Sequence, residues 1–269
     1  MADPHPCYDP DDTTAAECYR TALRALAAAG VEFLVGGAYA LARYAGIVRH
    51  TKDLDLFLRP CDRDAALAAL AAAGFRTEVT YPHWLAKAFR ADYFIDLIYN
   101  SGNGAAPIDD GWFAHAAGAE VLCEPVRLCP PEETLWSKAF VMERDRYDGA
   151  DVAHIIRAAG DRLDWRRLLG RFGPHWRVLY VHLVLFGFVY PGERDRVPGW
   201  LMEELGGRLR AEFAAAPPAG RVCRGTLLAA VQYAADVEWW DYEDARLPPH
   251  GTMTPEQVAV WVEGIRVGR

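Results

Sequence analysis

Hydrophobic positions follow two different periods along the chain, and the change of period divides it. In the first half, stretches with helical spacing alternate with short runs of β-branched and aromatic residues, a pattern typical of an α/β (α+β) fold. The predicted helices of this half are 13–30, 38–46 and 64–73. The predicted strands are 31–35, 52–58, 75–79, 86–90 and 93–99, with one or two more within 120–128.

The pattern becomes almost wholly helical beyond Cys129, where two consecutive prolines interrupt the chain. The predicted helices of this second half are 131–144, 149–159, 164–171, 175–189, 198–214, 222–236 and 255–266. We therefore predict three parts: a flexible, acidic tail at 1–12, an α/β domain at 13–129 and a helical domain at 130–269.

Charge and composition narrow the function classes. The 269 residues carry a formal net charge of −8 without a run of Lys or Arg, which argues against extended contact with a nucleic-acid backbone. The longest apolar run, 178–190, is shorter than the about 20 residues that span a bilayer, and the acidic start does not resemble a signal peptide. Six cysteines without a C-x-x-C pair indicate reduced thiols, so we expect a cytoplasmic protein.

Two aspartates, Asp53 and Asp55, lie two residues apart in a predicted strand, so the alternation of a strand puts both side chains on one face. Neighbouring carboxylates repel each other, and such a pair persists where a cation neutralises it. Hard oxygen ligands of this kind suit Mg²⁺. The alternative is that one of the two is a solvated residue at the end of a strand.

A third aspartate, Asp96, lies in the middle of an apolar predicted strand, where an unpaired charge is costly. If this strand lies beside 52–58, Asp96 completes a cluster of three carboxylates. The alternative is an ion pair with Arg90 or Lys87 on a neighbouring strand.

A pair of glycines, Gly36 and Gly37, lies between a predicted strand and a predicted helix. Glycine lets the backbone approach a bulky anion, and the N-terminus of a helix favours negative charge. Tight turns also use such pairs of glycines. The pair therefore indicates an anion site only because it lies one helix before the aspartates.

Together these motifs resemble the signature of the nucleotidyltransferase superfamily, which includes DNA polymerase beta, the antibiotic nucleotidyltransferases and several bacterial toxins. The segment Val35-Gly36-Gly37-Ala38, a helix and then Arg49-His50-Thr51-Lys52-Asp53-Leu54-Asp55-Leu56 looks like the AbiEii-type and lincosamide-type branches. The resemblance covers residues 30–160. It implies a polymerase-beta-like catalytic domain with a small mixed sheet at 13–129, followed by a helical domain.

The resemblance also implies roles for the motif residues. Asp53, Asp55 and Asp96 would be the catalytic carboxylates and would bind one or two Mg²⁺ ions that bridge the phosphates of a nucleoside triphosphate such as ATP. Asp96 would also help to deprotonate the acceptor hydroxyl. Gly36 and Gly37 would hold the triphosphate.

Three residues beside the aspartates are further candidates for nucleotide binding. Thr51 either donates a hydrogen bond to a phosphate or only begins the strand. Arg49 and Lys52 either offset phosphate charge or are ordinary surface residues.

Lys138 resembles the lysine that reaches the triphosphate from the helical domain in this branch; the alternative is a solvated lysine. In the stretch that follows, Asp148 and Asp151 either bind ligand or cap the next helix. This chain has Tyr147 where the family often has Arg or Lys, so the fourth motif departs from the family pattern.

We expect an enzyme that transfers a nucleoside monophosphate from a nucleoside triphosphate to an acceptor hydroxyl and releases pyrophosphate. The acidic net charge favours a small-molecule acceptor over an RNA end. One alternative is a toxin-type enzyme that modifies tRNA, which a basic concave surface beside Asp53 would favour. Another is a nucleotide-binding or interaction module without turnover, against which the complete set of motifs argues.

Overall fold

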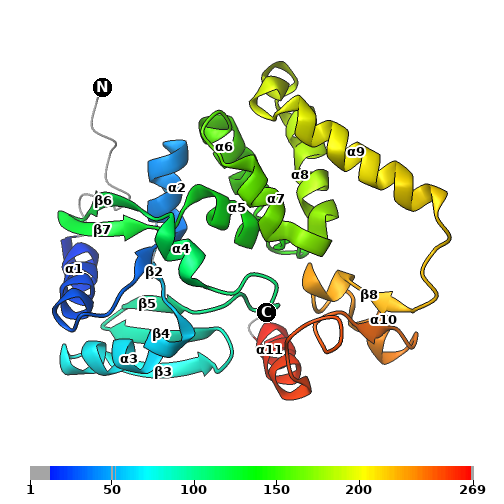
Figure 1. The fold of residues 1–269 in the computed structure, drawn as a ribbon. Helices are drawn as coiled ribbons and strands as arrows, with labels where there is room; N and C mark the ends of the chain where they lie inside the picture. Colours follow the sequence, from blue (N-terminus) through cyan, green and yellow to red (C-terminus); the bar gives the residue numbers. More distant parts are fainter. Residues whose placement is uncertain (1–12, 50, 52, 268–269) are drawn as a thin grey trace. The chain divides into compact units, whose positions relative to one another are not determined.

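The computed structural model describes residues 13–49, 51 and 53–267, so the predicted tail at 1–12 lies outside the described residues. The chain divides into two compact units, and each is described by itself (Figure 1). The first unit extends to Pro130 and also takes in Ala259–Trp261. The second comprises Pro131–Val258 and the residues from Val262 onward.

A seven-stranded mixed sheet forms the centre of the first unit, in the order β3-β4-β5-β2-β1-β7-β6. The strands are β1 (Leu34–Val35), β2 (Asp53–Phe57), β3 (Arg76–Tyr81), β4 (Leu85–Arg90), β5 (Tyr93–Ile98), β6 (Ala117–Val121) and β7 (Glu124–Leu128). β2 is parallel to β5 and β1 is parallel to β7, whereas the other neighbours are antiparallel. The predicted small mixed sheet is therefore confirmed.

Two helices, α1 (Thr13–Ala28) and α3 (Arg63–Ala72), pack on each other and against the sheet, and they lie side by side in Figure 1. The alternation of β2 turns Leu54 and Leu56 into this layer, where both are fully buried. They join a core that contains Leu23 of α1 and Leu70 of α3. Burial of each such side chain contributes about 1.5–3 kcal/mol, so the apolar alternation fixes which face of β2 points inward.

The other face of β2 is only partly covered. Helix α2 (Gly37–Ala45) begins directly beyond β1, and the short helix α4 (Asp110–Ala114) brings Trp112 onto the ring of Phe57, with 5.3 Å between the ring centroids. The polar positions that precede Phe57 on this face are half-buried. The sequence did not predict α4, because five residues are too few to show a helical period.

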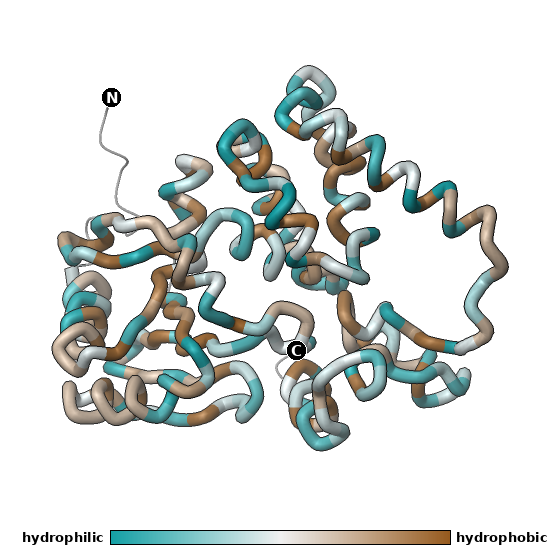
Figure 2. The backbone as a smooth tube through the Cα atoms, in the orientation of Figure 1, coloured by the Kyte–Doolittle hydropathy of each residue, from teal (hydrophilic) through white to brown (hydrophobic). Residues whose placement is uncertain are grey.

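The second unit is largely helical, as predicted. Its helices are α5 (Pro131–Ala139), α6 (Gly149–Ala159), α7 (Trp165–Phe172), α8 (Trp176–Val189), α9 (Gly199–Ala214), α10 (Ala234–Glu238) and the two ends of α11 (Pro255–Val267), whose residues Ala259–Trp261 belong to the first unit. Further 3₁₀ turns lie at Gly173–His175, Pro191–Arg196 and Gly225–Leu227. The most apolar of them is α8, which is mainly brown in Figure 2. Within the described residues no helix combines the length and hydropathy that a membrane span requires.

The predicted helix at 222–236 is wrong. Two-residue strands β8 (Val222–Cys223) and β9 (Glu243–Asp244) pair in parallel there, and only Ala234–Glu238 is α-helical. The reason is a contact that no local pattern reveals: Val222 and Cys223 pair with the distant residues Glu243 and Asp244. Asp244 is also buried, in an ion pair of 2.6 Å with Arg246.

The helix predicted at 131–144 is shorter than expected. It ends at Ala139, because Met142 and Tyr147 then bridge across a tight loop. The region 120–128 holds parts of two strands, β6 and β7, joined at Leu122 and Cys123, which both have positive φ values.

Candidate active site

Three carboxylates meet on the partly covered face of the sheet. Parallel pairing of β2 with β5 sets Asp55 directly beside Asp96, and Asp53 projects from the same face two residues earlier. One carboxylate oxygen from each of the three lies within 4.8 Å of the others, and all three residues are half-buried. We call these residues the carboxylate triad; the predicted convergence is confirmed, whereas their catalytic role stays a prediction.

The opposite face explains why the triad forms. Leu54 and Leu56 on β2 and Ile95 and Leu97 on β5 alternate with the aspartates and are fully buried. A shift of either strand by one residue would bury the carboxylates and expose the leucines, so the hydrophobic core fixes the register that brings the acids together.

The donors suit a hard divalent cation. Carboxylate oxygens are the ligands that Mg²⁺ prefers, and a close set of them is stabilised by a cation because the negative charges otherwise repel. Among the described residues this is the one group of three or more acidic, His or Cys side chains with metal-binding spacing. The chemistry and geometry of the triad therefore fit the predicted metal.

The glycine pair lies against the triad. The amide of Gly36 donates a hydrogen bond of 3.0 Å to the backbone oxygen of Asp55. Gly37 has a φ of +54°, and a Cβ atom there would overlap the carboxylate of Asp55. Only glycine satisfies both conditions, so the turn approaches the strand closely and starts α2 beside the acids. Because the first amides of a helix face outward without intrahelical partners, this end of α2 is a suitable place for phosphate oxygens.

The three nucleotide-binding candidates next to the aspartates are Thr51, Arg49 and Lys52, and each has a different outcome. The Thr51 hydroxyl donates a hydrogen bond to the Asp53 carboxylate, which places Thr51 at the edge of the triad. Arg49 is exposed on the loop before β2. Lys52 lies outside the described residues.

The alternative for Asp96 is also realised. Lys87 on β4 lies opposite Asp96 in the antiparallel pair, and its Nζ donates a hydrogen bond of 2.7 Å to Asp96 Oδ1. Arg90, the other residue considered, instead lies over the ring of Phe75. Asp96 thus belongs to the triad and also to an ion pair, so the two predicted alternatives for this residue occur together.

Lys138 in the second unit is not a solvated lysine. Its Nζ donates hydrogen bonds to Asp151 Oδ2 at 2.8 Å and to Asp148 Oδ2 at 3.1 Å, and its side chain is 17% exposed. We call these three residues the lysine cluster. Asp148 stands at the N-cap of α6 without a capping hydrogen bond from its side chain, so the capping alternative is wrong for that residue.

Charges within the lysine cluster outweigh burial. Burial alone would raise the pKa of the Asp148 carboxyl, but Lys138 and Arg146 together hold it below its usual value. Beside them, the ring of Tyr147 stacks on His182, with 6.4 Å between centroids. Burial lowers the pKa of His182, whose Nε2 donates to the backbone oxygen of Ala139. We therefore interpret His182 as a structural residue.

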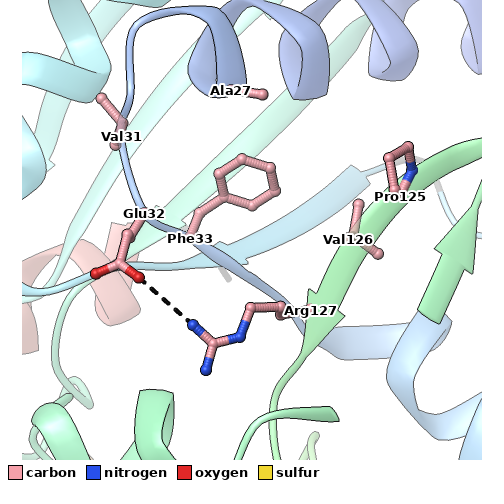
Figure 3. Close-up of a pocket in the computed structure, with 7 residues that line it drawn as sticks. All are labelled: Ala27, Val31, Glu32, Phe33, Pro125, Val126 and Arg127. Atoms are coloured by element: carbon pink, nitrogen blue, oxygen red, sulfur yellow. Dashed lines mark hydrogen bonds and ion pairs between the residues drawn. The ribbon is translucent and has the colours of Figure 1, made fainter. Parts of the chain in front are cut away.

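A separate surface pocket lies where the end of α1 meets β7 (Figure 3). Its lining is apolar except for Glu32 and Arg127, which form an ion pair of 3.4 Å. None of the predicted site residues lines it. A pocket with one neutralised pair offers no counterpart to the triad, so we do not assign it a part in the chemistry.

A family described as uncharacterised nucleotidyltransferase matches residues 11–174. The chain belongs to this nucleotidyltransferase family. The match confirms the resemblance to the superfamily, and it spans the glycine pair, the carboxylate triad and the lysine cluster. The nucleotidyltransferase has no match among curated protein sequences.

Solved structures also resemble the nucleotidyltransferase. The antibiotic-resistance factor ANT(2'')-Ia is 16% identical, with 76% of this chain and 95% of that chain covered and a TM-score of 0.38. The lincosamide antibiotic adenylyltransferase LnuA, solved with lincomycin bound, is 13% identical over 52% of this chain and 94% of its own, with a TM-score of 0.39. JHP933 from Helicobacter pylori is 12% identical over 77% and 98%, with a TM-score of 0.41.

Proposed function

We propose that this nucleotidyltransferase transfers a nucleoside monophosphate from an Mg²⁺-bound nucleoside triphosphate to a hydroxyl group of a small-molecule acceptor. In this reaction the acceptor oxygen forms a bond to the α-phosphorus, and the bond from that phosphorus to the bridging oxygen of the pyrophosphate breaks. The acceptor hydroxyl loses its proton, and pyrophosphate leaves with the bridging oxygen.

One observation carries the proposal: three carboxylate oxygens lie within 4.8 Å of one another beside the start of α2. The acids supply ligands for a divalent cation, and the helix start offers amides for phosphate. Such an arrangement provides both requirements of phosphoryl transfer, which are charge stabilisation and positioning.

The residues divide the work. A bound Mg²⁺ would lower the pKa of the attacking hydroxyl and offset charge on the phosphates. Asp53, Asp55 and Asp96 would hold the ion beside the nucleotide. Gly36 and Gly37 leave room for the triphosphate at the start of α2. Asp96, half-buried on the next strand, accepts the proton of the acceptor hydroxyl.

Four other residues keep the nucleotide-binding roles that the sequence predicts. Thr51 lies next to the phosphates in this proposal, because its hydroxyl is hydrogen-bonded to the carboxylate of Asp53. Arg49, on the loop before β2, and Lys52, which directly precedes Asp53 in the sequence, supply positive charge. Lys138 acts as a point charge on phosphate and so governs nucleotide affinity.

The charge of the chain supports a small acceptor. With a net charge of −8 and no basic run, the protein lacks the electrostatic footprint that binds an RNA backbone. A small polyhydroxylated molecule, by contrast, needs only a local set of hydrogen bonds.

The test uses each of the four nucleoside triphosphates labelled at the α-phosphate, with Mg²⁺ and two acceptor pools: a small-molecule extract and total tRNA. We expect label from one nucleotide in the small-molecule pool, with an equal amount of pyrophosphate released. The matched control is Asp55→Asn, which should transfer no label. Label in tRNA alone would overturn the acceptor class, and absence of label from both pools with every nucleotide would overturn the proposed activity.

A further inference from the structure

A lysine extends the line of the triad across the sheet. Lys87 on β4 lies opposite Asp96 on β5, Asp96 lies opposite Asp55 on β2, and Gly36 donates its amide hydrogen bond to Asp55. The four residues therefore form one row across neighbouring strands. Because side chains at paired positions project from the same face, Lys87 stands on the face that carries the acids.

Two contacts hold this lysine in place. Its Nζ lies 2.7 Å from Asp96 Oδ1, with side chains that are 22% and 15% exposed, and 4.3 Å from the centroid of the Phe94 ring. Phe94 projects from the same face of β5 as Asp96, two residues earlier. A lysine side chain in solvent samples many rotamers. The ion pair with Asp96 and the contact with the Phe94 ring together restrict these rotamers and fix the ammonium group relative to the triad.

The strand on the other side of β4 does not compete for the lysine. Glu78 on β3 is the cross-strand neighbour of Lys87, yet its carboxylate bonds to Arg76 at 2.7 Å and accepts a hydrogen bond from Thr80 at 3.5 Å. The ammonium group of Lys87 is thus directed to Asp96, and one oxygen of that carboxylate is engaged by a fixed positive charge.

We propose that Lys87 is a positioning residue that orients Asp96 and weakens divalent-cation binding at the carboxylate triad. The hydrogen bond to Oδ1 fixes the rotation of the Asp96 carboxylate relative to the other two acids. The ammonium charge repels a divalent cation bound to the same carboxylate. Lys87 therefore keeps the cation exchangeable together with the nucleotide. This inference rests on the proposed function.

The test compares three variants by Mn²⁺ binding in the absence of nucleotide, followed by electron paramagnetic resonance. Lys87→Met removes the charge and keeps an unbranched side chain that is one atom shorter, and we expect it to bind Mn²⁺ about tenfold more tightly, which corresponds to about 1.4 kcal/mol. Lys87→Arg keeps a charged donor and should bind Mn²⁺ like the wild type. Arg24→Met removes a cation from α1, where its side chain is 61% exposed and pairs with Glu124, and should leave the affinity unchanged.

Turnover gives the second readout. Lys87→Met should lower kcat about tenfold without a change in the KM for the nucleotide, because Asp96 loses its orientation while the phosphate contacts remain. Lys87→Arg should restore most of kcat. If Lys87→Met unfolds, Lys87→Gln, which keeps a hydrogen-bond donor without charge, is expected to give the same tighter Mn²⁺ binding.

The outcomes separate this inference from the proposed function. If the wild type shows no Mn²⁺ binding that Asp55→Asn removes, the metal site and the proposed function are both wrong. If the wild type binds Mn²⁺ at the triad and transfers label, but folded Lys87→Met or Lys87→Gln keeps the wild-type Mn²⁺ affinity and kcat, then only the role of Lys87 is overturned.

Discussion

The carboxylate triad and the lysine cluster both bring aspartates together around a lysine, but the two groups are organised in opposite ways. In the lysine cluster, both acids converge on Lys138, at 2.8 and 3.1 Å, so the ammonium lies between them. In the triad, the acids converge on one another, with oxygens within 4.8 Å, and Lys87 bonds one of them from the edge of the row. In the first arrangement one ammonium group bonds both acids, whereas in the second Lys87 bonds Asp96 and the three acids lie close to one another.

The contrast shows what distinguishes a metal site from an internal ion pair. The presence of acidic residues does not distinguish the two, because both groups are acidic and both are shielded from solvent. The decisive feature is the arrangement of the acids: both acids of the lysine cluster bond one ammonium group, whereas the three acids of the triad lie close to one another and Lys87 bonds Asp96 from the edge. Mutual repulsion among the triad is relieved by a divalent ion, and the relief is available for binding and catalysis.

Loss of a triad acid should have the largest effect. Asp55→Asn is expected to lower transfer by on the order of a thousandfold or more, because a cation ligand is removed where charge develops in the reaction. Without metal the variant should be as stable as the wild type or more stable, since one repelling charge is gone. Transfer of label from the α-labelled nucleotide measures the first effect, and thermal unfolding without Mg²⁺ measures the second. The matched control is Asp92→Asn, which changes an exposed acid of the same unit and should keep full activity.

A methyl group at the glycine turn should have the next largest effect. Gly37→Ala puts a Cβ into the space of the Asp55 carboxylate, and we expect a loss of about a hundredfold in kcat/KM from displacement of that group. The positive φ adds a cost of about 1–3 kcal/mol. Gly46→Ala carries a similar φ of +68° with no atom within 4 Å, so it should lose stability and keep activity. Equal activity in the two variants would show that the turn does not constrain the triad.

Removal of the central lysine should affect the other unit mainly through stability. Lys138→Met leaves Asp148 and Asp151 close together without their ammonium group, which we expect to cost about 3 kcal/mol in the free energy of unfolding. Urea unfolding measures this cost. The predicted phosphate contact of Lys138 adds a weaker affinity for the Mg²⁺-bound nucleotide, measured by calorimetry well below the unfolding temperature. Unchanged affinity would reduce Lys138 to its role inside the lysine cluster.

The smallest effect concerns pH. Burial lowers the pKa of His182, His175 and His83 below the ordinary value for histidine. As the pH falls, these histidines become protonated in the unfolded chain at a higher pH than in the folded protein. Their full contribution to the free energy of unfolding is therefore present above about pH 6.5 and is lost as the pH is lowered towards the depressed pKa values of the folded state. Urea unfolding at pH 7.5 and pH 5.5 should show lower stability at pH 5.5. A higher stability at pH 5.5 would contradict the buried, neutral state of these side chains.

The sequence contained most of what builds the triad. Alternation in β2 and β5 placed Asp53, Asp55 and Asp96 opposite buried leucines, and the cost of burying a charge marked Asp96 as a residue with a partner. These arguments succeed because they depend on local period and on a penalty that holds in any fold.

Other features depended on contacts between distant residues. The pairing of Lys87 with Asp96 depends on the register between β4 and β5, which no local pattern reveals. The sequence indicated only that a basic residue one strand from Asp96 could pair with it, and this applied equally to Arg90. The failed helix at 222–236 has the same cause, because Val222 and Cys223 pair with Glu243 and Asp244, which lie outside that segment. Local propensity is overridden where pairing with a distant strand fixes the backbone.

The most direct test of the central claim is anomalous diffraction from crystals grown with Mn²⁺ and a non-hydrolysable nucleoside triphosphate. We predict a manganese peak bound by carboxylate oxygens of Asp53, Asp55 and Asp96, at ligand distances of about 2.1 Å, with the triphosphate at the start of α2. A manganese peak at Asp148 and Asp151, or triphosphate density away from Gly36 and Gly37, would contradict the assignment of the triad as the metal site of this nucleotidyltransferase.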